Sequence, residues 1–275
     1  MGFTINTNTA SNNAYRNLTL NQNAQSKSLE KLSSGLRINR AADDAAGLAI
    51  SEGLKNQVSG MTQAARNAQD GISVIQTAEG ALTEVHSILN RVRDLAVQAG
   101  NDSNNADSRT AIQTEVTALS EELTRISAST NFNGIELLDG TNASLTFQIG
   151  AGGVAANDQI TVDLTNIGTV ATAVGALTFD SAANAATSIT ALDAQITNVS
   201  TARSELGASQ NRLESVTKSL NVSIENLSSA GSRIRDTDMA SEMANFTRSQ
   251  ILSQAGTAML SQANQMNSGV MQLLQ

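Results

Sequence analysis

The chain has 275 residues and a formal net charge of −8 at pH 7, with no proline, cysteine or tryptophan and only 2% aromatic residues. An acidic balance of this size argues against a nucleic-acid partner, because binding phosphates requires a basic surface. The absence of cysteine excludes disulfides, thiolate metal sites and cysteine nucleophiles. The absence of proline, where average usage would give roughly a dozen, favours long helices because proline removes a helical hydrogen bond.

The first forty residues are rich in Asn, Thr, Ser and Gln, with apolar residues at thin spacing, among them Leu18, Leu29 and Leu32. They show no basic region followed by an apolar run, so we expect no secretory signal peptide of the general pathway. No window of the chain approaches the 18 or so apolar residues of a membrane span, and we expect no membrane insertion.

A connector follows, because the segment LSSGLRINRAADDAAGLAISEGL (Leu32–Leu54) breaks one predicted helix at Ser33-Ser34-Gly35 and starts another. Arg37 and Arg40 fall in the connector. Either Asp43 or Asp44 can accept hydrogen bonds from the free N–H groups at the start of the next helix.

The next helix is predicted to run to Gly100, where a polar loop follows. About 55 residues at 1.5 Å each make it about 80 Å long, far longer than a compact domain needs. Its apolar residues recur at alternating intervals of three and four residues. Between Ile75 and Val85 the pattern is shifted by three residues, and such a shift overwinds a coiled coil locally. The stripe consists of Leu54, Val58, Met61, Ala65, Ala68, Ile72 and Ile75, then Val85, Leu89, Val92 and Ala96.

Two further helices repeat this spacing, so three narrow apolar stripes would have to bury one another in a bundle. The first stripe is Ile112, Val116, Leu119, Leu123 and Ile126, and the second is Ile189, Leu192, Ile196, Val199, Leu206, Leu213, Val216, Leu220 and Leu227. Arg203 and Gln210 fall on the second stripe, where polar side chains could fix the register at some cost in stability.

Between the second and third predicted helices of the bundle, the spacing of the apolar residues changes. Asn133-Gly134 and Asp139-Gly140 are turn signals. Residues 144–149 and 159–164 alternate apolar and polar side chains, as half-buried strands do. Residues 168–188 consist mainly of Gly, Ala, Thr and Ser and are predicted to be a surface connection.

The C-terminal segment 239–275 predicts an amphipathic helix that ends on an apolar stripe. Neither this segment nor the N-terminal one can bury enough apolar surface alone to offset its ordering entropy. We therefore expect both to be mobile until they pair with each other and with neighbouring copies. The apolar positions are Met239, Met243, Phe246, Leu252, Ala255, Met259, Ala263, Met266, Val270 and Leu273.

The predicted fold is mainly α: a long-helix, coiled-coil-like antiparallel bundle with a small β-hairpin region and terminal helices that pair on assembly. Residues 1–42 and 232–275 would form the terminal helical domain, and residues 43–140 and 186–231 the bundle. Residues 141–185 would hold the hairpin and a short connection, leaving no room for a large outer domain.

No catalytic constellation appears in the sequence. The one histidine, His86, lies beside the apolar stripe and is interpreted as a surface helix residue, and a single histidine cannot form the two-histidine motif of a zinc protease. Asp102 and Asn104 begin like a calcium loop, but the following residues do not continue the pattern. We expect no enzymatic activity, cofactor or metal.

Several long motifs, in order, resemble bacterial flagellin over roughly residues 1–140 and 190–275. They are LSSGLRINRAADDAAGLAIS (Leu32–Ser51), NRVRDLAVQAGNDSN (Asn90–Asn104), IQTEV (Ile112–Val116), TNFNGIELLDG (Thr130–Gly140) and SRIRDTDMASEMANFTRSQIL (Ser232–Leu252). The resemblance implies a short flagellin without outer domains. It would be a structural subunit that self-assembles into the extracellular flagellar filament and leaves the cell unfolded through the flagellar type III apparatus.

The resemblance also implies partners and residues. The partners would be further copies of the chain, an export chaperone, the filament cap, hook-junction proteins and a host Toll-like receptor, which would contact Arg91, Leu95 and Glu115. The connector would touch neighbouring copies, although a simple polar linker between two helices remains open. The polymerisation residues would be Leu18, Leu29, Leu32, Arg37, Arg40, Asp43, Asp44, Phe246, Leu252, Met259, Met266, Val270 and Leu273.

Two alternatives remain open at this point. A hook–filament junction protein would share the helical ends but would not be expected to match so many of these motifs. A secreted membrane-active helical protein could use the Met-rich C-terminal stripe, but the polar face around that stripe has few of the basic residues typical of membrane-surface helices.

Overall fold

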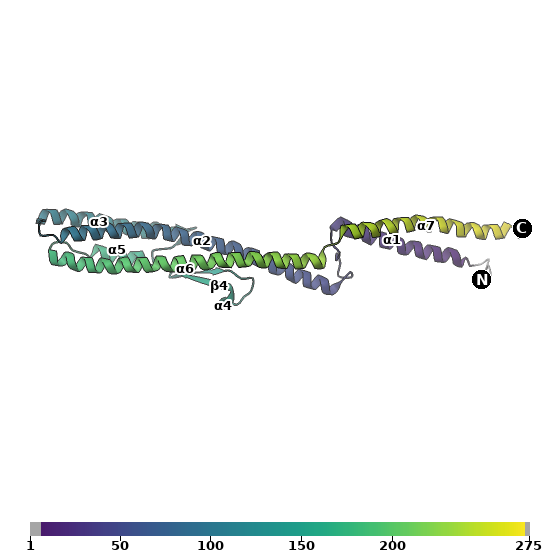
Figure 1. The fold of residues 1–275 in the computed structure, drawn as a ribbon, viewed down its shortest axis with the longest axis horizontal. Helices are drawn as coiled ribbons and strands as arrows, with labels where there is room; N and C mark the ends of the chain where they lie inside the picture. Colours follow the sequence, from purple (N-terminus) through teal and green to yellow (C-terminus); the bar gives the residue numbers. More distant parts are fainter. Residues whose placement is uncertain (1–6, 273–275) are drawn as a thin grey trace. The chain divides into compact units, whose positions relative to one another are not determined.

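The computed structural model describes residues 7–272, and the surroundings of side chains for residues 7–266 (Figure 1). The chain divides into two compact units. Unit 1 takes the two ends of the chain, up to Asn56 and from Asn226 onward, and unit 2 is Gln57–Glu225. The predicted domain boundaries at residues 42 and 232 lie near helix ends, whereas this division falls inside two long helices.

The described chain is mainly helical, as predicted. Its longer helices are α1 (Thr9–Ser34), α2 (Ala45–Ala99), α3 (Ala106–Ser129), α5 (Ile167–Gly175), α6 (Ala182–Arg235) and α7 (Met239–Gln272). The short elements are α4 (Ala155–Asp158), β1 (Asn131–Phe132), β2 (Ile135–Glu136), β3 (Ser144–Gln148) and β4 (Gln159–Asp163).

The parts of α2 and α6 that belong to unit 2 run antiparallel, and two ion pairs fix their direction. Arg93 on α2 pairs with Asp193 on α6 at 2.6 Å, and Glu79 pairs with Arg203 at 3.1 Å. Residue numbers on α6 therefore rise as those on α2 fall. Arg203 is the polar residue that the sequence placed on the apolar stripe, and its bond to Glu79 lets it hold the register of the two helices.

The core of unit 2 follows the predicted apolar stripes. Val85, Leu89 and Val92 on α2 are fully buried, as are Val116 on α3 and Leu192 on α6. All five belong to one continuous core cluster. The stripe passes through the predicted three-residue slip, with Ile75 and Ala78 both buried on either side of it. The predicted antiparallel bundle is confirmed.

The prediction of a surface connection over residues 168–188 is wrong. Residues Ile167–Gly175 form α5, which packs against α3 and buries Ile167, Val170 and Val174. The hydroxyl of Ser120 on α3 donates to the Ala171 carbonyl at 3.0 Å. These three apolar residues follow helical spacing behind an Asn N-cap, but the surrounding small residues hid the pattern.

Two antiparallel β-ribbons complete unit 2. The strands predicted at residues 144–149 and 159–164 are β3 and β4, which pair from Ser144–Asp163 to Gln148–Gln159. Asn133 and Gly134, the predicted turn, both have positive φ (51° and 78°) between β1 and β2. Such angles at both central positions form the hairpin turn that Asn-Gly favours.

Unit 1 pairs the two ends of the chain, since α1 and α7 lie side by side (Figure 1). The Asn8 side chain donates to the Ala263 carbonyl at 3.0 Å. Leu18 lies against Gly256, so the two helices are antiparallel. At the other end α1 stops at the predicted break, where Gly35 takes φ 72° and its N–H bonds to the Lys31 carbonyl.

Candidate functional site

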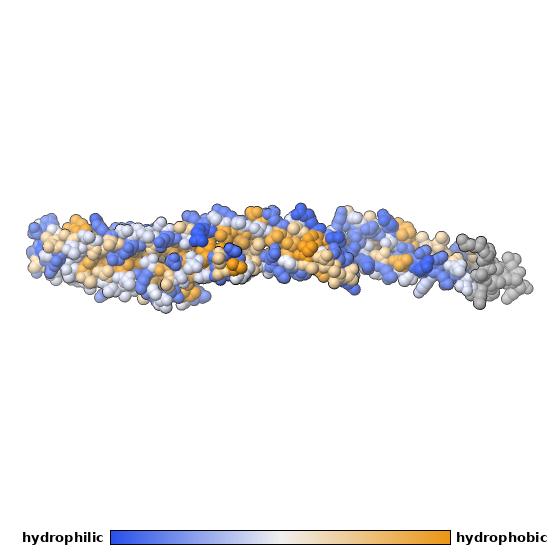
Figure 2. Space-filling view, turned by 90° about the horizontal axis from the view of Figure 1, so that it is seen from below, coloured by the Kyte–Doolittle hydropathy of each residue, from blue (hydrophilic) through white to orange (hydrophobic). Residues whose placement is uncertain are grey.

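The α7 helix exposes a large share of its apolar side chains. Figure 2 shows hydrophobic patches open to solvent among hydrophilic residues where α1 and α7 lie. Contiguous exposed apolar surface on a folded chain marks an interaction site. The exposed apolar residues of this helix, among the described side chains, are Met239, Met243, Ile251, Leu252, Met259 and Met266.

Two grooves run along these helices. The first lies between α1 and α7, where Leu18 and Leu20 of α1 face Leu252 and Met259 of α7 across small residues such as Gly256. The second lies on α7 itself, and its lining is Met243, Ala244, Thr247, Arg248, Ile251 and Leu252. Both grooves are mainly apolar, so each can accept an apolar side chain from another helix.

The connector between α1 and α2 is bound to the connector between α6 and α7. Leu36 and Asp236 form an antiparallel bridge. The Arg37 N–H donates to the Arg235 carbonyl at 2.6 Å, and the Thr237 N–H donates to the Gly35 carbonyl at 3.0 Å. The Arg37 guanidinium also donates to the Ile234 carbonyl at 2.6 Å. The connector is therefore an ordered clasp and not a loose link.

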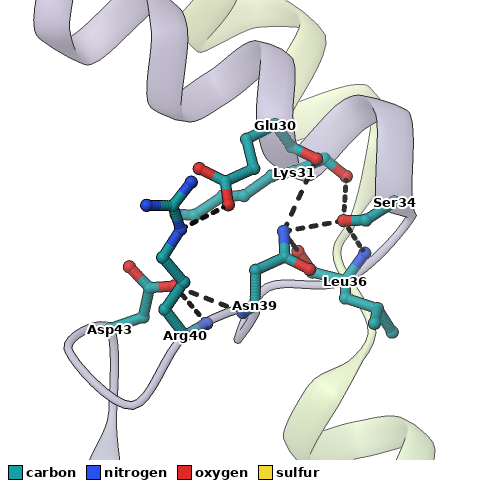
Figure 3. Close-up of polar contacts among 7 residues, drawn as sticks. All are labelled: Glu30, Lys31, Ser34, Leu36, Asn39, Arg40 and Asp43. Carbon is teal, nitrogen blue, oxygen red and sulfur yellow. Dashed lines mark hydrogen bonds and ion pairs between the residues drawn. The ribbon is translucent and has the colours of Figure 1, made fainter.

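Polar contacts close the α1 connector onto itself (Figure 3). The Asn39 amide donates to Ser34 Oγ at 2.7 Å, and Arg40 Nε pairs with Glu30 at 2.8 Å. The hydrogen bond from Arg40 to Glu30 and the attraction between their charges raise the pKa of Arg40. The N–H groups of Arg40 and Asn39 donate to the Asp43 carboxylate and hold the pKa of that carboxyl below its usual value.

The start of α2 is fixed by Asp44, whose carboxylate accepts from the Gly47 N–H at 2.9 Å. Of the two predicted capping residues, Asp44 therefore caps the helix and Asp43 holds the turn before it. Ile38 is only 1% exposed and lies close to Gly47, where an added Cβ would approach its Cδ1 to 2.7 Å. Ile38 thus anchors the connector on the first turn of α2.

The sequence did not predict the anchoring role of Ile38 or the ion pair that joins the end of α6 to α2. Arg235 at the end of α6 pairs with Glu52 of α2 at 2.6 Å. Ile38 was the one apolar residue between Leu36 and Ala41 in a polar stretch, which is a signal that could have been used. The Arg235–Glu52 pair had no such signal, because these residues are far apart in the chain.

The predicted polymerisation residues fall into three groups by their surroundings. Leu18 is buried between α1 and α7, and Leu32 and Phe246 are partly buried. Leu29, Leu252, Met259 and Met266 are exposed. Val270 belongs to α7, but its side chain lies outside the described part of the chain, as does the whole of Leu273.

The three predicted receptor-contact residues are not all on the surface. Arg91 on α2 and Glu115 on α3 form an ion pair at 2.7 Å, and both side chains are partly exposed. Leu95 is only 2% exposed and belongs to the core cluster of unit 2. Leu95 lies beside the predicted apolar stripe and is covered because α2 buries a wider face than that stripe. Its contact with a receptor, which the resemblance implies, stays a prediction.

Between residues 7 and 272 no three His, Cys, Asp or Glu side chains gather where they could hold a metal ion. Over the same range no helix combines the length and the apolar character needed to cross a bilayer.

Comparison with known proteins gives matches over nearly the whole chain. A family model described as the bacterial flagellin N-terminal helical region matches residues 5–143, and one described as the C-terminal helical region matches residues 189–274. The flagellin of Halalkalibacterium halodurans is 52% identical over 272 residues, covering 98% of this chain and 99% of the relative. The flagellin of Bacillus subtilis is 47% identical over 304 residues, with 98% and 99% covered.

A solved structure is also similar. The crystal structure of Bacillus cereus flagellin has a TM-score of 0.50 and 33% identity to this chain, over 56% of this chain and 88% of that one. The sequence matches therefore cover the segments between the local motifs as well, and the match in fold covers a little over half of the chain.

Proposed function

Because the chain belongs to the bacterial flagellin family, we propose that its terminal helices and connector clasp form the surface through which copies assemble into a filament. Membership of this family makes the chain a structural subunit of the extracellular flagellar filament and not an enzyme. The subunit polymerises with further copies of itself.

The observation that carries the proposal is the exposed apolar face of α7. Ile251, Leu252 and Met259 are each about half exposed or more, although burying such side chains would gain roughly 1.5–3 kcal/mol apiece. A surface of one copy that fits a different surface of the next builds an open helical filament when the rotation does not close. The apolar grooves on α1 and α7 supply receiving surfaces for this kind of contact.

The connector clasp supports the same proposal, because it joins the segment that follows α1 to the segment that precedes α7. Its hydrogen bonds join residues about 200 positions apart, Arg37 with Ile234 among them. Arg37 is exposed, and each copy carries 25 acidic side chains with which its guanidinium can pair. Arg40 is also exposed but already pairs with Glu30 of its own chain. We infer that the connector contacts neighbouring copies and that assembly stabilises α1 and α7, which bury little on their own.

Export and its partners follow from family membership as further proposals. The chain would leave the cell unfolded through the flagellar type III apparatus and meet an export chaperone, the filament cap and hook-junction proteins. The absence of proline and cysteine suits this route, since neither prolyl isomerisation nor disulfide exchange would delay folding after export.

A second candidate function is recognition by a host Toll-like receptor. Arg91 and Glu115 support it, because their paired and partly exposed side chains present both charges on the flank formed by α2 and α3. Exchanging the two residues, Arg91→Glu with Glu115→Arg, keeps the pair but reverses its direction. We expect receptor signalling to fall while the melting temperature stays unchanged, and unchanged signalling would contradict the contact.

The assembly proposal is tested by removing residues 239–275. Purified chain with and without this segment is incubated with filament seeds or ammonium sulfate and viewed by electron microscopy. We expect tubes of uniform diameter from the full chain and none from the shortened one, while circular dichroism still shows a helical bundle.

Filaments from the shortened chain would contradict the role of α7. Monomer that persists in the full chain would favour a hook–filament junction protein instead. Binding of the full chain to liposomes, in place of polymerisation, would favour the membrane-active alternative.

A further inference from the structure

The methionines of this chain are concentrated on one helix. Five of the seven lie in the segment that forms α7: Met239, Met243, Met259, Met266 and Met271. The first four have described side chains, which are 48%, 51%, 67% and 51% exposed. Met61 on α2 is only partly exposed and belongs to unit 2, so it offers an internal reference.

Few other side chains of the chain compete for an oxidant. The sequence has no cysteine and no tryptophan, and only one tyrosine and one histidine. A two-electron oxidant such as hydrogen peroxide reacts with thiolates and thioethers according to their accessibility. Because thiols are absent, the exposed thioethers of α7 are the principal targets.

These thioethers lie in the proposed assembly surface. Met259 and Met266 follow Leu252 at intervals of seven residues, so the three share one side of α7. Met259 lines the groove between α1 and α7. Met243 lines the second groove with Ile251 and Leu252, and Met239 lies one turn before it.

We propose that Met239, Met243, Met259 and Met266 are oxidation sites and that their conversion to methionine sulfoxide blocks assembly through α7. This inference rests on the proposed function of α7 as an assembly surface. In the reaction, the sulfur lone pair attacks one peroxide oxygen, an S–O bond forms and the O–O bond breaks. The departing hydroxide takes the remaining proton and leaves as water, so the sulfur is oxidised and the peroxide is reduced.

Oxidation changes the surface in two ways that oppose close packing. The thioether is flexible and apolar and fills irregular gaps between helices, whereas the sulfoxide is polar and chiral. A buried sulfoxide oxygen also loses its hydrogen bonds to water, and the free energy of association rises unless a donor replaces them. Once copies have assembled, the same contacts cover the sulfur atoms. The four methionines should therefore be protected from peroxide in the filament and accessible to it in the monomer.

The experiment compares monomer and filament treated with hydrogen peroxide, with catalase added to end the reaction. Peptide mass spectrometry maps the sulfoxides, and sedimentation after seeding measures the critical concentration for polymerisation. In the monomer we expect the four α7 sites to oxidise faster than Met61. In the filament we expect the same four sites to oxidise more slowly than they do in the monomer. The critical concentration of oxidised monomer should rise at least about tenfold, which corresponds to about 1.4 kcal/mol.

A variant with Met239, Met243, Met259 and Met266 each changed to Leu is the matched control. Leucine keeps the apolar volume and the helix propensity but has no oxidisable sulfur. This variant should polymerise equally well before and after peroxide, whereas Met61→Leu alone should remain as sensitive as the unchanged chain. Treating oxidised unchanged chain with methionine sulfoxide reductases should restore polymerisation, a readout that does not depend on the fourfold variant assembling.

The inference is overturned if chain carrying all four sulfoxides polymerises as well as untreated chain. Equal oxidation rates at Met61 and at the α7 sites would overturn the assignment of the sites, as would a fourfold variant that peroxide still disables. Failure of untreated, unchanged chain to polymerise would instead count against the proposed function, and the sulfoxide map would still show whether the four sites are oxidised first.

Discussion

Unit 1 and unit 2 are both built from long helices, yet they treat their apolar side chains differently. Unit 2 buries a continuous core in which residues such as Val85, Leu89 and Leu213 are fully covered. In unit 1, over residues 7–56 and 226–266, the buried apolar side chains are Leu18 and Ile38. Unit 2 therefore has a continuous buried core, whereas unit 1 leaves most of its apolar side chains open to solvent in the single chain.

The two units also differ in charge. Unit 1 carries 9 basic and 7 acidic side chains, a balance of +2, and unit 2 carries 8 basic and 18 acidic ones, a balance of −10. Like charges repel when copies approach closely, so a nearly neutral unit packs against itself more easily than an acidic one. Burial and charge thus both support the proposal that copies pack against one another through unit 1.

The largest expected effect is the loss of stability caused by a cavity in the core of unit 2. Leu89 is 0% exposed, so Leu89→Ala removes buried atoms and leaves a void. We expect the free energy of unfolding to fall by about 2–5 kcal/mol. Urea unfolding of the monomer, followed by circular dichroism, measures it, and an unchanged midpoint would contradict a packed core in unit 2.

In unit 1 we expect a substitution of an apolar residue to weaken polymerisation and to leave the stability of the monomer almost unchanged. Leu252 is exposed in the monomer, so Leu252→Gln should change monomer stability by less than about 0.5 kcal/mol. The lost burial between copies, roughly 1.5–3 kcal/mol, should raise the critical concentration for polymerisation at least about tenfold. Gln254→Ala, at an exposed polar position of the same helix, is the matched control. Equal polymerisation of Leu252→Gln and unchanged chain would argue against this part of α7 as a contact.

A smaller effect distinguishes two glycines in the first turns of α2. A Cβ at Gly47 would approach Asp44 Oδ2 to 2.5 Å and Ile38 Cδ1 to 2.7 Å, whereas nothing lies within 4 Å of one at Gly53. Gly53→Ala should stabilise the helix by about 0.5–1 kcal/mol. Gly47→Ala should instead displace the Asp44 cap, at a cost of about 1 kcal/mol. The protection of the amide hydrogens of residues 45–56 from exchange is measured in both variants. Equal protection in Gly47→Ala and Gly53→Ala would show that Ile38 does not anchor the connector.

The smallest effect is a pH dependence of the connector. The Arg40 and Asn39 N–H groups stabilise the ionised Asp43, so its folded pKa lies below the usual 3.8. A depressed pKa means that the stabilisation is complete above the unfolded value and is lost as the pH falls through the folded one. The amide NMR shifts of Asn39 and Arg40 should therefore move together below the usual aspartate pKa, and Asp43→Asn should abolish the movement. Shifts that persist in that variant would assign the titration to another group.

The predictions from sequence were correct where a local pattern was strong. The spacing of three and four located the stripes of α2, α3 and α6, and two-residue alternation located β3 and β4 within one residue. Gly35 ends α1 as predicted, because only a residue without a Cβ enters the left-handed region easily. Each of these features depends on neighbours within a few residues.

The predictions failed where the outcome depended on what packs against a segment. The residues of α5 have weak local signals, and α3 makes them a buried helix by covering Ile167 and Val174. No local pattern could pair Arg235 with Glu52.

The helical class, the apolar stripes, the break at Gly35 and the family could all be predicted from the amino-acid sequence, since period, propensity and motif are properties of short segments. Which apolar residues are covered and which stay exposed depends on tertiary packing, because burial involves segments that are distant in the chain. Leu89 and Leu252 both occupy apolar positions of amphipathic helices, yet one is enclosed and the other faces solvent. The reason is the number of helices packed around each: a bundle encloses the first, and a two-helix pair cannot enclose the second.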